Sequence, residues 1–291
     1  MIFEVSHRTV YSYSQTVSIS HHLLHLTPRD AGFQICRDFA VEITPAPTVR
    51  APGIDYFGNP TTFVTIQQDH VELVLHALSS IEVADRPVPE AAATPPWEEV
   101  RDLARHDRSE AALAAFELTF ASPYVPIASE LRAYAARSFK PRRPILEAAQ
   151  ELTHRIFRDF TYEPGATTLA TGVTRAFAMR RGVCQDFTHI EIACLRALGV
   201  PARYVSGYLL TRPPEGKERL IGADASHAWL SIWIPGHDWI DLDPTNDVIP
   251  GREHITIGWG RDYGDVSPVS GIMFGGGAHE VSVAVDVLAA G

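Results

Sequence analysis

The sequence predicts an α+β protein in which an N-terminal antiparallel β-sandwich-like domain precedes a core of helices and strands. Three observations lead to this prediction. Apolar and polar residues alternate along most of the first 83 residues, a Pro-rich and Ala-rich segment follows, and apolar residues then recur at helical spacing. The chain has 291 residues, which leaves room for about two domains.

The first part of the chain is predicted to form strands. Residues Phe3, Val5, Thr9, Tyr11 and Tyr13 alternate with their neighbours, close to the period of two that half-buried strands show. Further strand-like runs, separated by Pro, Gly and Asn turn signals, are Val17–Leu26, Cys36–Thr44, Thr61–Gln67 and Val71–Val83. Several short strands at this spacing, with no helical pattern between them, are typical of a small antiparallel sandwich.

A change of composition then indicates a linker, from Arg86 to Pro96. Helical patterns follow at Trp97–His106, Ser109–Phe116, Ile127–Ser138 and Pro144–Phe160. The last pattern is the clearest, because its apolar residues recur at steps of three and four along one face. These residues are Ile145, Ala148, Ala149, Leu152, Ile156 and Phe157.

A second β region is expected further along the chain, at Arg203–Leu210, Ala228–Ile234 and Trp239–Leu242, and the alternation over Val281–Val287 predicts a final strand. We therefore divide the chain into an N-terminal β domain (1–88), a linker with helices (89–143) and a catalytic core (144–291).

Composition limits the classes of partner. The net charge is −10 and basic residues are dispersed, apart from Lys140–Arg143, so no nucleic-acid footprint is visible. No apolar run approaches the roughly 20 residues that span a bilayer, and the first residues, Met1–Val5, lack the pattern of a signal peptide. We expect a cytoplasmic protein that does not bind a membrane.

Three cysteines form neither a disulfide framework nor a CxxC metal pair. Cys184 precedes a helical pattern that ends at Gly199, so the helix N-terminus favours its thiolate. The alternative is that Cys184 is a small buried apolar residue. We assign Cys194, in the middle of the same helix, and Cys36, inside a β run, to the core.

A nucleophilic thiol needs a base, and the base needs a group that fixes its orientation. His227 opens an apolar strand that a short turn joins to a second strand ending near Asp243, so hairpin pairing places the two side chains together. Asp241 lies on the same strand face and is not separated from Asp243 by this argument. An Asp before Pro244 can also simply initiate a turn.

Three segments together resemble the core motifs of transglutaminase-like proteins. They are Gly182–Phe187, His227–Trp229 and Trp239–Asn246, and they occur in the family's order Cys, His, Asp. The N-terminal β region, Gly260–Tyr263 and Gly275–Gly277 are similar to features of a bacterial branch of that family. The resemblance implies a papain-like core without cofactor or metal. It also implies Cys184 as nucleophile, His227 as general base and acid, and Asp243 rather than Asp241 as orienting group.

The function that follows is thiol-dependent acyl transfer on peptide or protein amides through a thioester, ending in hydrolysis or in transfer to an amine. The alternative is a catalytically silent binding module. Tyr162 is a candidate oxyanion donor, or else a core tyrosine. Redox sensing is disfavoured, because Cys194 lies ten residues along the helix, on the order of 15 Å from Cys184. The glycines at 275–277 form either a loop beside the site or a turn before the last strand.

Overall fold

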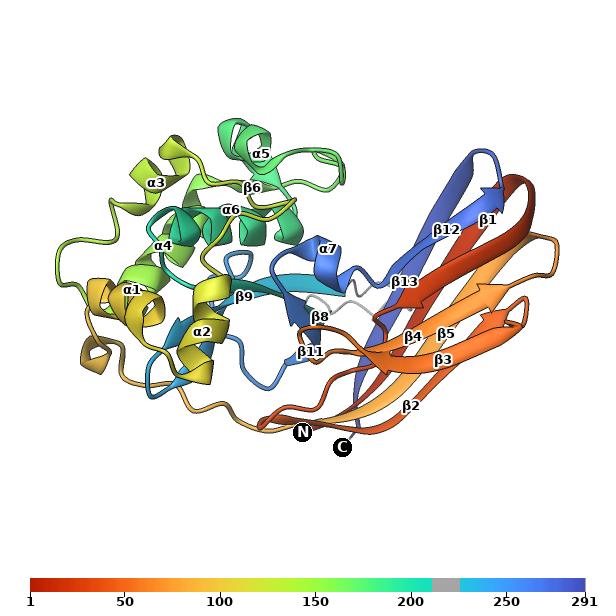
Figure 1. Cartoon of the computed structure of the whole chain (residues 1–291), viewed down its shortest axis with the longest axis horizontal. Coiled ribbons are helices and arrows are strands. Elements are labelled where there is room, and N and C mark those ends of the chain that lie inside the picture. The colour runs from red at the N-terminus through yellow and green to blue at the C-terminus, as the bar shows by residue number, and fades with distance from the viewer. Residues whose placement is uncertain (211–225, 291) are drawn as a thin grey trace, which may run out of the picture.

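The computed structural model describes residues 1–210 and 226–290, which form two parts packed against each other. Figure 1 shows the long strands of an antiparallel sheet on one side and a helix-rich core on the other. The larger sheet contains seven strands and the core sheet four. The predicted α+β class, with a sandwich-like domain beside a mixed core, is confirmed.

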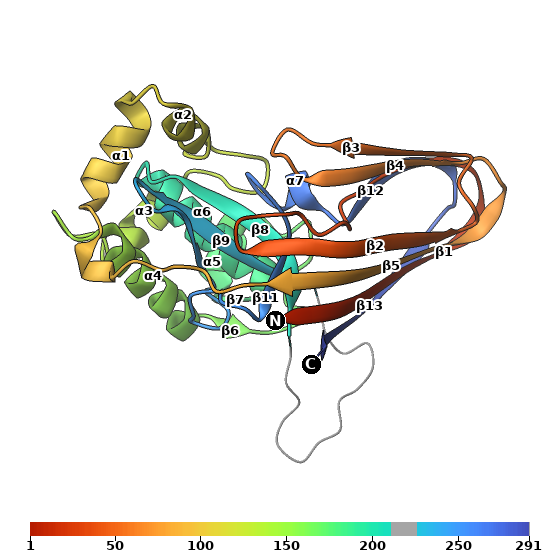
Figure 2. The same ribbon diagram turned by 90° about the horizontal axis from the view of Figure 1, so that it is seen from below.

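The larger sheet is organised around one long strand. Its members are β1 (Ile2–Leu24), β2 (Gln34–Thr44), β3 (Val49–Ile54), β4 (Pro60–Ile66), β5 (His70–Val83), β12 (Val269–Gly275) and β13 (His279–Ala290). The first half of β1 pairs with β5 and β13, and the second half pairs with β4 and β12. The register of β1 is broken between Ser12 and Val17. The two halves therefore belong to two layers, which Figure 2 shows one above the other.

Apolar side chains fill the space between these layers, as alternation of buried and exposed residues requires. The buried cluster consists of Tyr13, Val17, Leu24, Leu26, Val41, Val64, Ile66, Leu73, Leu75 and Ala77. The sequence predicted two runs where the structure has the continuous strand β1, and it missed β3 and β12. Cys36 was wrongly assigned to the core, because it lies on β2 at the edge of the sheet and is partly exposed.

The C-terminal segment returns to the N-terminal sheet. Residues 269–290, which the sequence-based division put in the catalytic core, pair with β1 as β12 and β13. Three glycines, Gly275, Gly276 and Gly277, connect these two strands. Their φ values are 93°, 86° and 63°, in the left-handed region that residues with a Cβ rarely adopt. Of the two interpretations of these glycines, the turn before the last strand is the one observed.

The core places helices against a second antiparallel sheet. Its strands are β8 (Ala202–Leu209), β9 (Ser226–Ile234), β10 (Asp238–Leu242) and β11 (His254–Gly260), in the order β10-β9-β8-β11. The helices are η1 (Ala91–Ala93), α1 (Trp97–His106), α2 (Glu110–Glu117), α3 (Ser129–Ala135), α4 (Ile145–Asp159), α5 (Val173–Met179), α6 (Cys184–Ala197) and α7 (Tyr263–Val266). Helix α6 packs on β8 and β9, and most of its residues are buried.

The four predicted helices correspond to α1–α4 and are confirmed with small changes at their ends. Phe157 was wrongly placed on the buried face of α4, because it is 47% exposed while Leu152 and Ile156 are fully buried. Strand β11 was not predicted, since its two glycines weaken a strand pattern. Gly199 ends α6 as expected, with φ 80°.

An apolar interface joins the two parts. Phe3, Val5, Ile81, Val83, Val285 and Val287 of the larger sheet contact Tyr208, Ile255 and Ile257 of the core sheet. Polar contacts reinforce it: the Nδ1 of His7 lies 2.7 Å from the hydroxyl of Tyr208. Within residues 1–210 and 226–290, every helix is too short or too polar to cross a membrane. The cytoplasmic location stays a prediction.

Candidate active site

Cys184 is the first residue of α6, as the sequence predicted, and it is partly buried at that helix end. The Asp186 carboxylate accepts hydrogen bonds from the Val183 N–H at 2.8 Å and from the Thr167 hydroxyl at 2.6 Å. These bonds fix the first turn of the helix. The N–H groups of that turn have no intrahelical acceptor, so they favour a thiolate or an oxyanion beside Cys184.

Gly182 lies in close contact with the Asp186 side chain, just before α6 begins, because it has no Cβ. A Cβ added at Gly182 would lie 2.5 Å from the Asp186 Oδ2 and 2.8 Å from its Cβ. Gly182 also pairs with Tyr162, because β6 (Thr161–Tyr162) runs parallel to β7 (Arg181–Gly182). The glycine before Cys184 thus positions both the helix start and the strand that carries Tyr162.

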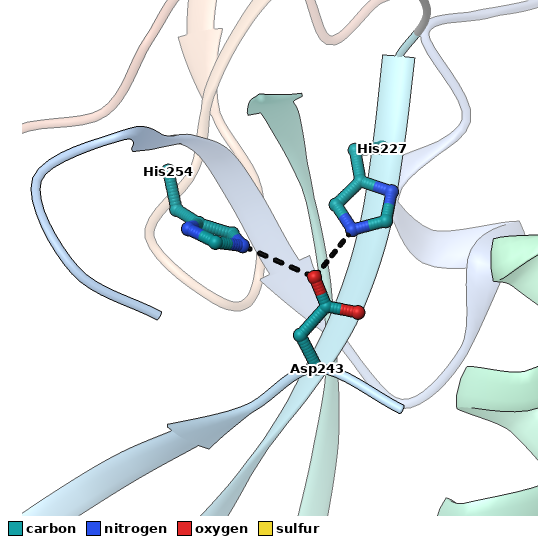
Figure 3. Close-up of side chains that lie close together, drawn as sticks. All are labelled: His227, Asp243 and His254. Carbon is teal, nitrogen blue, oxygen red and sulfur yellow. Dashed lines mark hydrogen bonds and ion pairs between the residues drawn. The ribbon is translucent and has the colours of Figure 1, made fainter. Parts of the chain in front are cut away.

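The β9–β10 hairpin brings His227 and Asp243 together. The register pairs Asp238 with Ile234 and Leu242 with Leu230, so the start of β9 faces the chain just beyond β10. The His227 Nε2 lies 2.7 Å from the Asp243 Oδ2 (Figure 3). The predicted proximity of these two side chains is therefore observed, with Asp243 fully buried and His227 nearly so.

The environment of His227 favours its charged form. Burial lowers the pKa of His227, but the interactions with Asp243 and then with Cys184 outweigh this effect and raise the pKa to about 10. Cys184 is therefore one of the groups that act on the imidazole. An imidazolium beside a thiol is the arrangement that stabilises a thiolate.

The Asp243 carboxylate accepts several hydrogen bonds in addition to the one from His227. Its Oδ1 accepts from the Thr245 N–H at 2.9 Å, and its Oδ2 accepts from the Asn246 side-chain amide at 2.7 Å. A second histidine, His254 at the start of β11, also reaches the Oδ2, at 3.1 Å (Figure 3). Burial raises the pKa of Asp243, but the hydrogen bonds from His227 and His254 hold it well below its usual range. The carboxylate is ionised.

His254 and Asn246 were not identified as site residues from the sequence. Asn246 belongs to the segment Trp239–Asn246, but nothing in the sequence assigns it a role. His254 is one of 13 histidines, and no local pattern separates it from the others. Only the course of the chain from Asp243 through a turn into β11 places His254 beside the carboxylate.

Asp241 has different partners, which separates it from Asp243. It forms an ion pair with Arg86 and accepts from the Trp229 Nε1 at 2.9 Å, and its other oxygen accepts from the Ser231 hydroxyl. Alternation did not distinguish the two residues, because they are two apart and share a strand face. In the structure Asp243 lies beyond the end of β10, in an isolated bridge with Val248. The structure therefore pairs Asp243, not Asp241, with His227.

Tyr162 lies near Cys184 but is not a core residue, since 51% of its side chain is exposed. Partial burial and then the charge of Cys184 raise the pKa of Tyr162. Its hydroxyl therefore stays protonated and able to donate at neutral pH. Tyr204, which is buried, also lies close enough for the charge of Cys184 to raise its pKa further, after burial.

His227, Asp243 and His254 each offer a ligand atom, and these atoms lie within 4.8 Å of one another. However, the ionised carboxylate only accepts hydrogen bonds, so the imidazole nitrogens that face it carry protons. A metal ion would have to displace both protons and compete with Asn246 for the same oxygen. The hydrogen bonding does not fit a resident metal site.

Comparisons with known proteins agree with this architecture. The model of the bacterial transglutaminase-like N-terminal region matches residues 3–82, and the model of the transglutaminase-like superfamily matches residues 132–244. An uncharacterized protein of Mycobacterium tuberculosis is 41% identical over 294 residues, covering 98% of this chain and 92% of the relative. One of Mycobacterium leprae is 33% identical, covering 97% of each.

Two further matches extend the comparison. A solved structure from Cytophaga hutchinsonii, described as a "putative cysteine protease", has a TM-score of 0.78 at 20% identity and covers 99% of this chain and 90% of its own. A protein-glutamine gamma-glutamyltransferase of Pseudomonas aeruginosa is 35% identical over 111 residues, 35% of this chain and 17% of that protein.

The fold and the site together define a two-part protein, with an α+β core beside an antiparallel β domain. The chain belongs to the transglutaminase-like superfamily, in the bacterial branch that carries this N-terminal region. This membership indicates an enzyme.

Proposed function

We propose that this chain catalyses acyl transfer on amide bonds, with Cys184 as nucleophile, His227 as general base and acid, and Asp243 as orienting group. The observation that carries the proposal is the 2.7 Å bond between His227 and Asp243, with the imidazole acting on Cys184 at the N-terminus of α6. A nucleophile, a base and an orienter in hydrogen-bonded sequence form the arrangement that covalent catalysis requires.

In the first half-reaction the Cys184 thiolate attacks the carbonyl carbon of the amide, and the π electrons move to the oxygen. The Cys184 N–H and the Tyr162 hydroxyl are the donors we assign to this oxyanion. When the intermediate collapses, the C–N bond breaks and the His227 imidazolium gives its proton to the leaving amine. A thioester on Cys184 remains.

In the second half-reaction water or an amine attacks the thioester, and His227 removes a proton from this nucleophile. The Cys184 thiolate then leaves, which regenerates the enzyme. Hydrolysis needs only water, whereas transfer also needs a site for the acceptor amine.

The first experiment is the pH dependence of Cys184 alkylation by iodoacetamide, with the modified peptide identified by mass. We expect rapid alkylation well below the ordinary thiol pKa of about 8.5, and its loss in His227→Ala. Cys36 is the internal control, because burial and then the charges of Asp30 and Asp38 raise its pKa to about 11.

Slow alkylation that follows an ordinary thiol pKa and ignores the His227→Ala substitution would favour the binding-module alternative. If the thiol is reactive, peptide amides incubated with and without an added amine distinguish the two reactions. A free acid as the only product indicates hydrolysis, and a new amide indicates transfer.

A further inference from the structure

Three arginines from separate elements meet in a cavity of about 490 Å³, between the larger sheet and the core sheet. Arg29 follows β1, Arg86 follows β5, and Arg203 lies on β8. Pockets of a few hundred Å³ at the junction of two domains commonly hold small molecules. The cavity plays no part in the proposed reaction.

The cavity is separate from the candidate active site. Arg203 on β8 lies opposite Ser231 on β9. Ser231 is four residues beyond His227, so the two are about 13 Å apart along the strand, at 3.3 Å per residue. The fully buried Trp229 lies between them on β9. Its Nε1 donates to Asp241, and its ring centre lies 5.2 Å from the ring centre of His254. A molecule in this cavity would not reach Cys184.

Arg203 is the central feature of this cavity. It is 8% exposed, and its guanidinium carbon lies 3.7 Å from the ring centre of Trp259 and 4.4 Å from that of Trp239. Its Nε makes one long hydrogen bond, 3.4 Å to the Ser231 hydroxyl. Across residues 1–210 and 226–290, its two terminal nitrogens have no hydrogen-bonded partner. Arg203 is thus a buried guanidinium that lines an open space, with four N–H donors that no described residue uses.

Neighbouring carboxylates do not neutralise this charge fully. Asp241 has the largest charge effect on Arg203, but its oxygens already accept from Arg86, Trp229 and Ser231. Burial and, to a lesser extent, the nearby charge of Arg29 lower the pKa of Arg203 to about 9, although the charge of Asp241 acts in the opposite direction. The lowered pKa of Arg203 shows that burial disfavours its charged form. An anion between the guanidinium groups of Arg203 and Arg29 would reduce this unfavourable free energy.

Arg29 is similarly short of a charged partner. Its guanidinium carbon lies 3.2 Å from the centre of the same Trp259 ring. Among the residues that the structure describes, it donates to two neutral oxygens, those of Phe57 and Asn59. Asp55 acts on it through charge alone. Two guanidiniums thus lie against one aromatic ring.

The rim of the cavity restricts the charge of a ligand. Asp85 is paired with Arg252, and Asp30 accepts the Cys36 N–H, but Asp238 acts on Arg203 only through its charge. These carboxylates oppose a dianion such as phosphate more strongly than a monoanion. Phe33, Ile249 and Trp259 add apolar surface to the lining.

We propose that this cavity is a binding site for a small organic monocarboxylate. Its carboxylate accepts two parallel hydrogen bonds from the terminal nitrogens of Arg203, and its apolar part contacts Phe33 and Trp259. Arginine presents a planar fork that matches a carboxylate in this way, whereas lysine does not.

The test is calorimetric titration of the full chain, in an amine buffer, with benzoate and hexanoate. Benzamide is the neutral counterpart of benzoate, and inorganic phosphate is the competing anion. We expect saturable binding of at least one carboxylate, about tenfold or more tighter than benzamide. Arg203→Met should weaken this binding at least tenfold, and Arg203→Lys should weaken it several-fold while keeping the charge. Arg142→Gln, at an exposed ion pair with Glu99, is the matched control and should bind as the wild type does.

Circular dichroism establishes that each variant is folded, and Arg203→Lys decides the question if Arg203→Met does not fold. The proposal is wrong if neither carboxylate saturates the wild type below 10 mM (roughly −3 kcal/mol of binding free energy), or if benzamide binds equally well. It is also wrong if phosphate binds more tightly than benzoate, or if folded Arg203 variants retain wild-type affinity.

Discussion

His254 donates its Nε2–H to the Asp243 oxygen that also accepts from His227, at 3.1 Å and 2.7 Å respectively. The carboxylate is thereby held from two strands, β9 and β11, and from the turn that follows β10. Such partners of a catalytic carboxylate restrict its rotation, and the orientation of the base depends on it. His254 is a positioning residue in this proposal, since it does not contact the nucleophile.

We predict that His254→Phe slows alkylation of Cys184 at pH 6 by about tenfold, in the range that supporting residues of a site show. The aromatic ring keeps the volume but removes the donor. His254→Gln keeps a donor and should recover part of the rate. Equal rates in both variants and in the wild type would show that Asp243 needs no second histidine. Thermal unfolding of both variants separates this effect from a loss of fold.

The raised pKa of His227 predicts a pH-dependent contribution to stability. The pKa is 6.5 in the unfolded chain and about 10 when folded, so the contribution is fully present below pH 6.5 and is lost as the pH rises through 10. The difference in unfolding free energy between wild type and His227→Gln should therefore shrink between these values. Its upper bound is about 5 kcal/mol, at about 1.4 kcal/mol per pKa unit.

Urea unfolding at pH 6, 8 and 10 measures this difference. Asp243→Asn is the control, since it removes the carboxylate that holds the imidazolium. In the Asp243→Asn background, the further substitution His227→Gln should change the unfolding free energy little. A wild-type advantage that stays constant across this pH range would contradict the raised pKa.

We predict that Gly182→Ala destabilises the protein by about 2 kcal/mol and slows alkylation of Cys184. The added Cβ would meet Asp186 at 2.5 Å and displace the start of α6. Gly172→Ala is a matched control, because a Cβ there meets nothing within 4 Å and its φ of −68° suits alanine. Urea unfolding and iodoacetamide rates for both variants form the test, and similar behaviour of the two would contradict it.

Glu191 on α6 is fully buried, and its substitution is predicted to stabilise the protein rather than destabilise it. Burial raises its pKa from 4.5 to about 8. The Thr153 hydroxyl lies 3.0 Å from the Ala149 carbonyl and 2.7 Å from the Glu191 Oε1. A hydroxyl that donates to the carbonyl accepts from a protonated Glu191.

For this acid the unfolded chain ionises first as the pH rises, so the wild type loses stability between pH 4.5 and pH 8. Glu191→Gln keeps the shape without the charge. We predict that this variant unfolds with nearly wild-type free energy at pH 4.5 but is more stable at pH 8, by on the order of a few kcal/mol. A constant difference across this range would show that Glu191 does not titrate there. Glu147→Gln, at a partly exposed position of α4, is measured in parallel as the comparison substitution.

The sequence alone determined the elements whose signals are local. The helical spacing in α4, the glycine stop after α6 and the alternation near the N-terminus all depend on neighbours within a few residues. Cys184 at a helix start and His227 at a strand start follow from the same local patterns, and hairpin pairing then brings Asp243 near. The catalytic roles of these three residues stay predictions.

Only the tertiary structure decided the contacts that join distant segments. The pairing of β12 and β13 with β1 links the two ends of the chain, and no local period encodes it. His254 beside Asp243, and Arg203 with Arg29 at Trp259, depend on how strands from different parts of the chain lie side by side. Side-chain burial at such junctions is a property of the packed sheets, so a one-dimensional pattern cannot specify it.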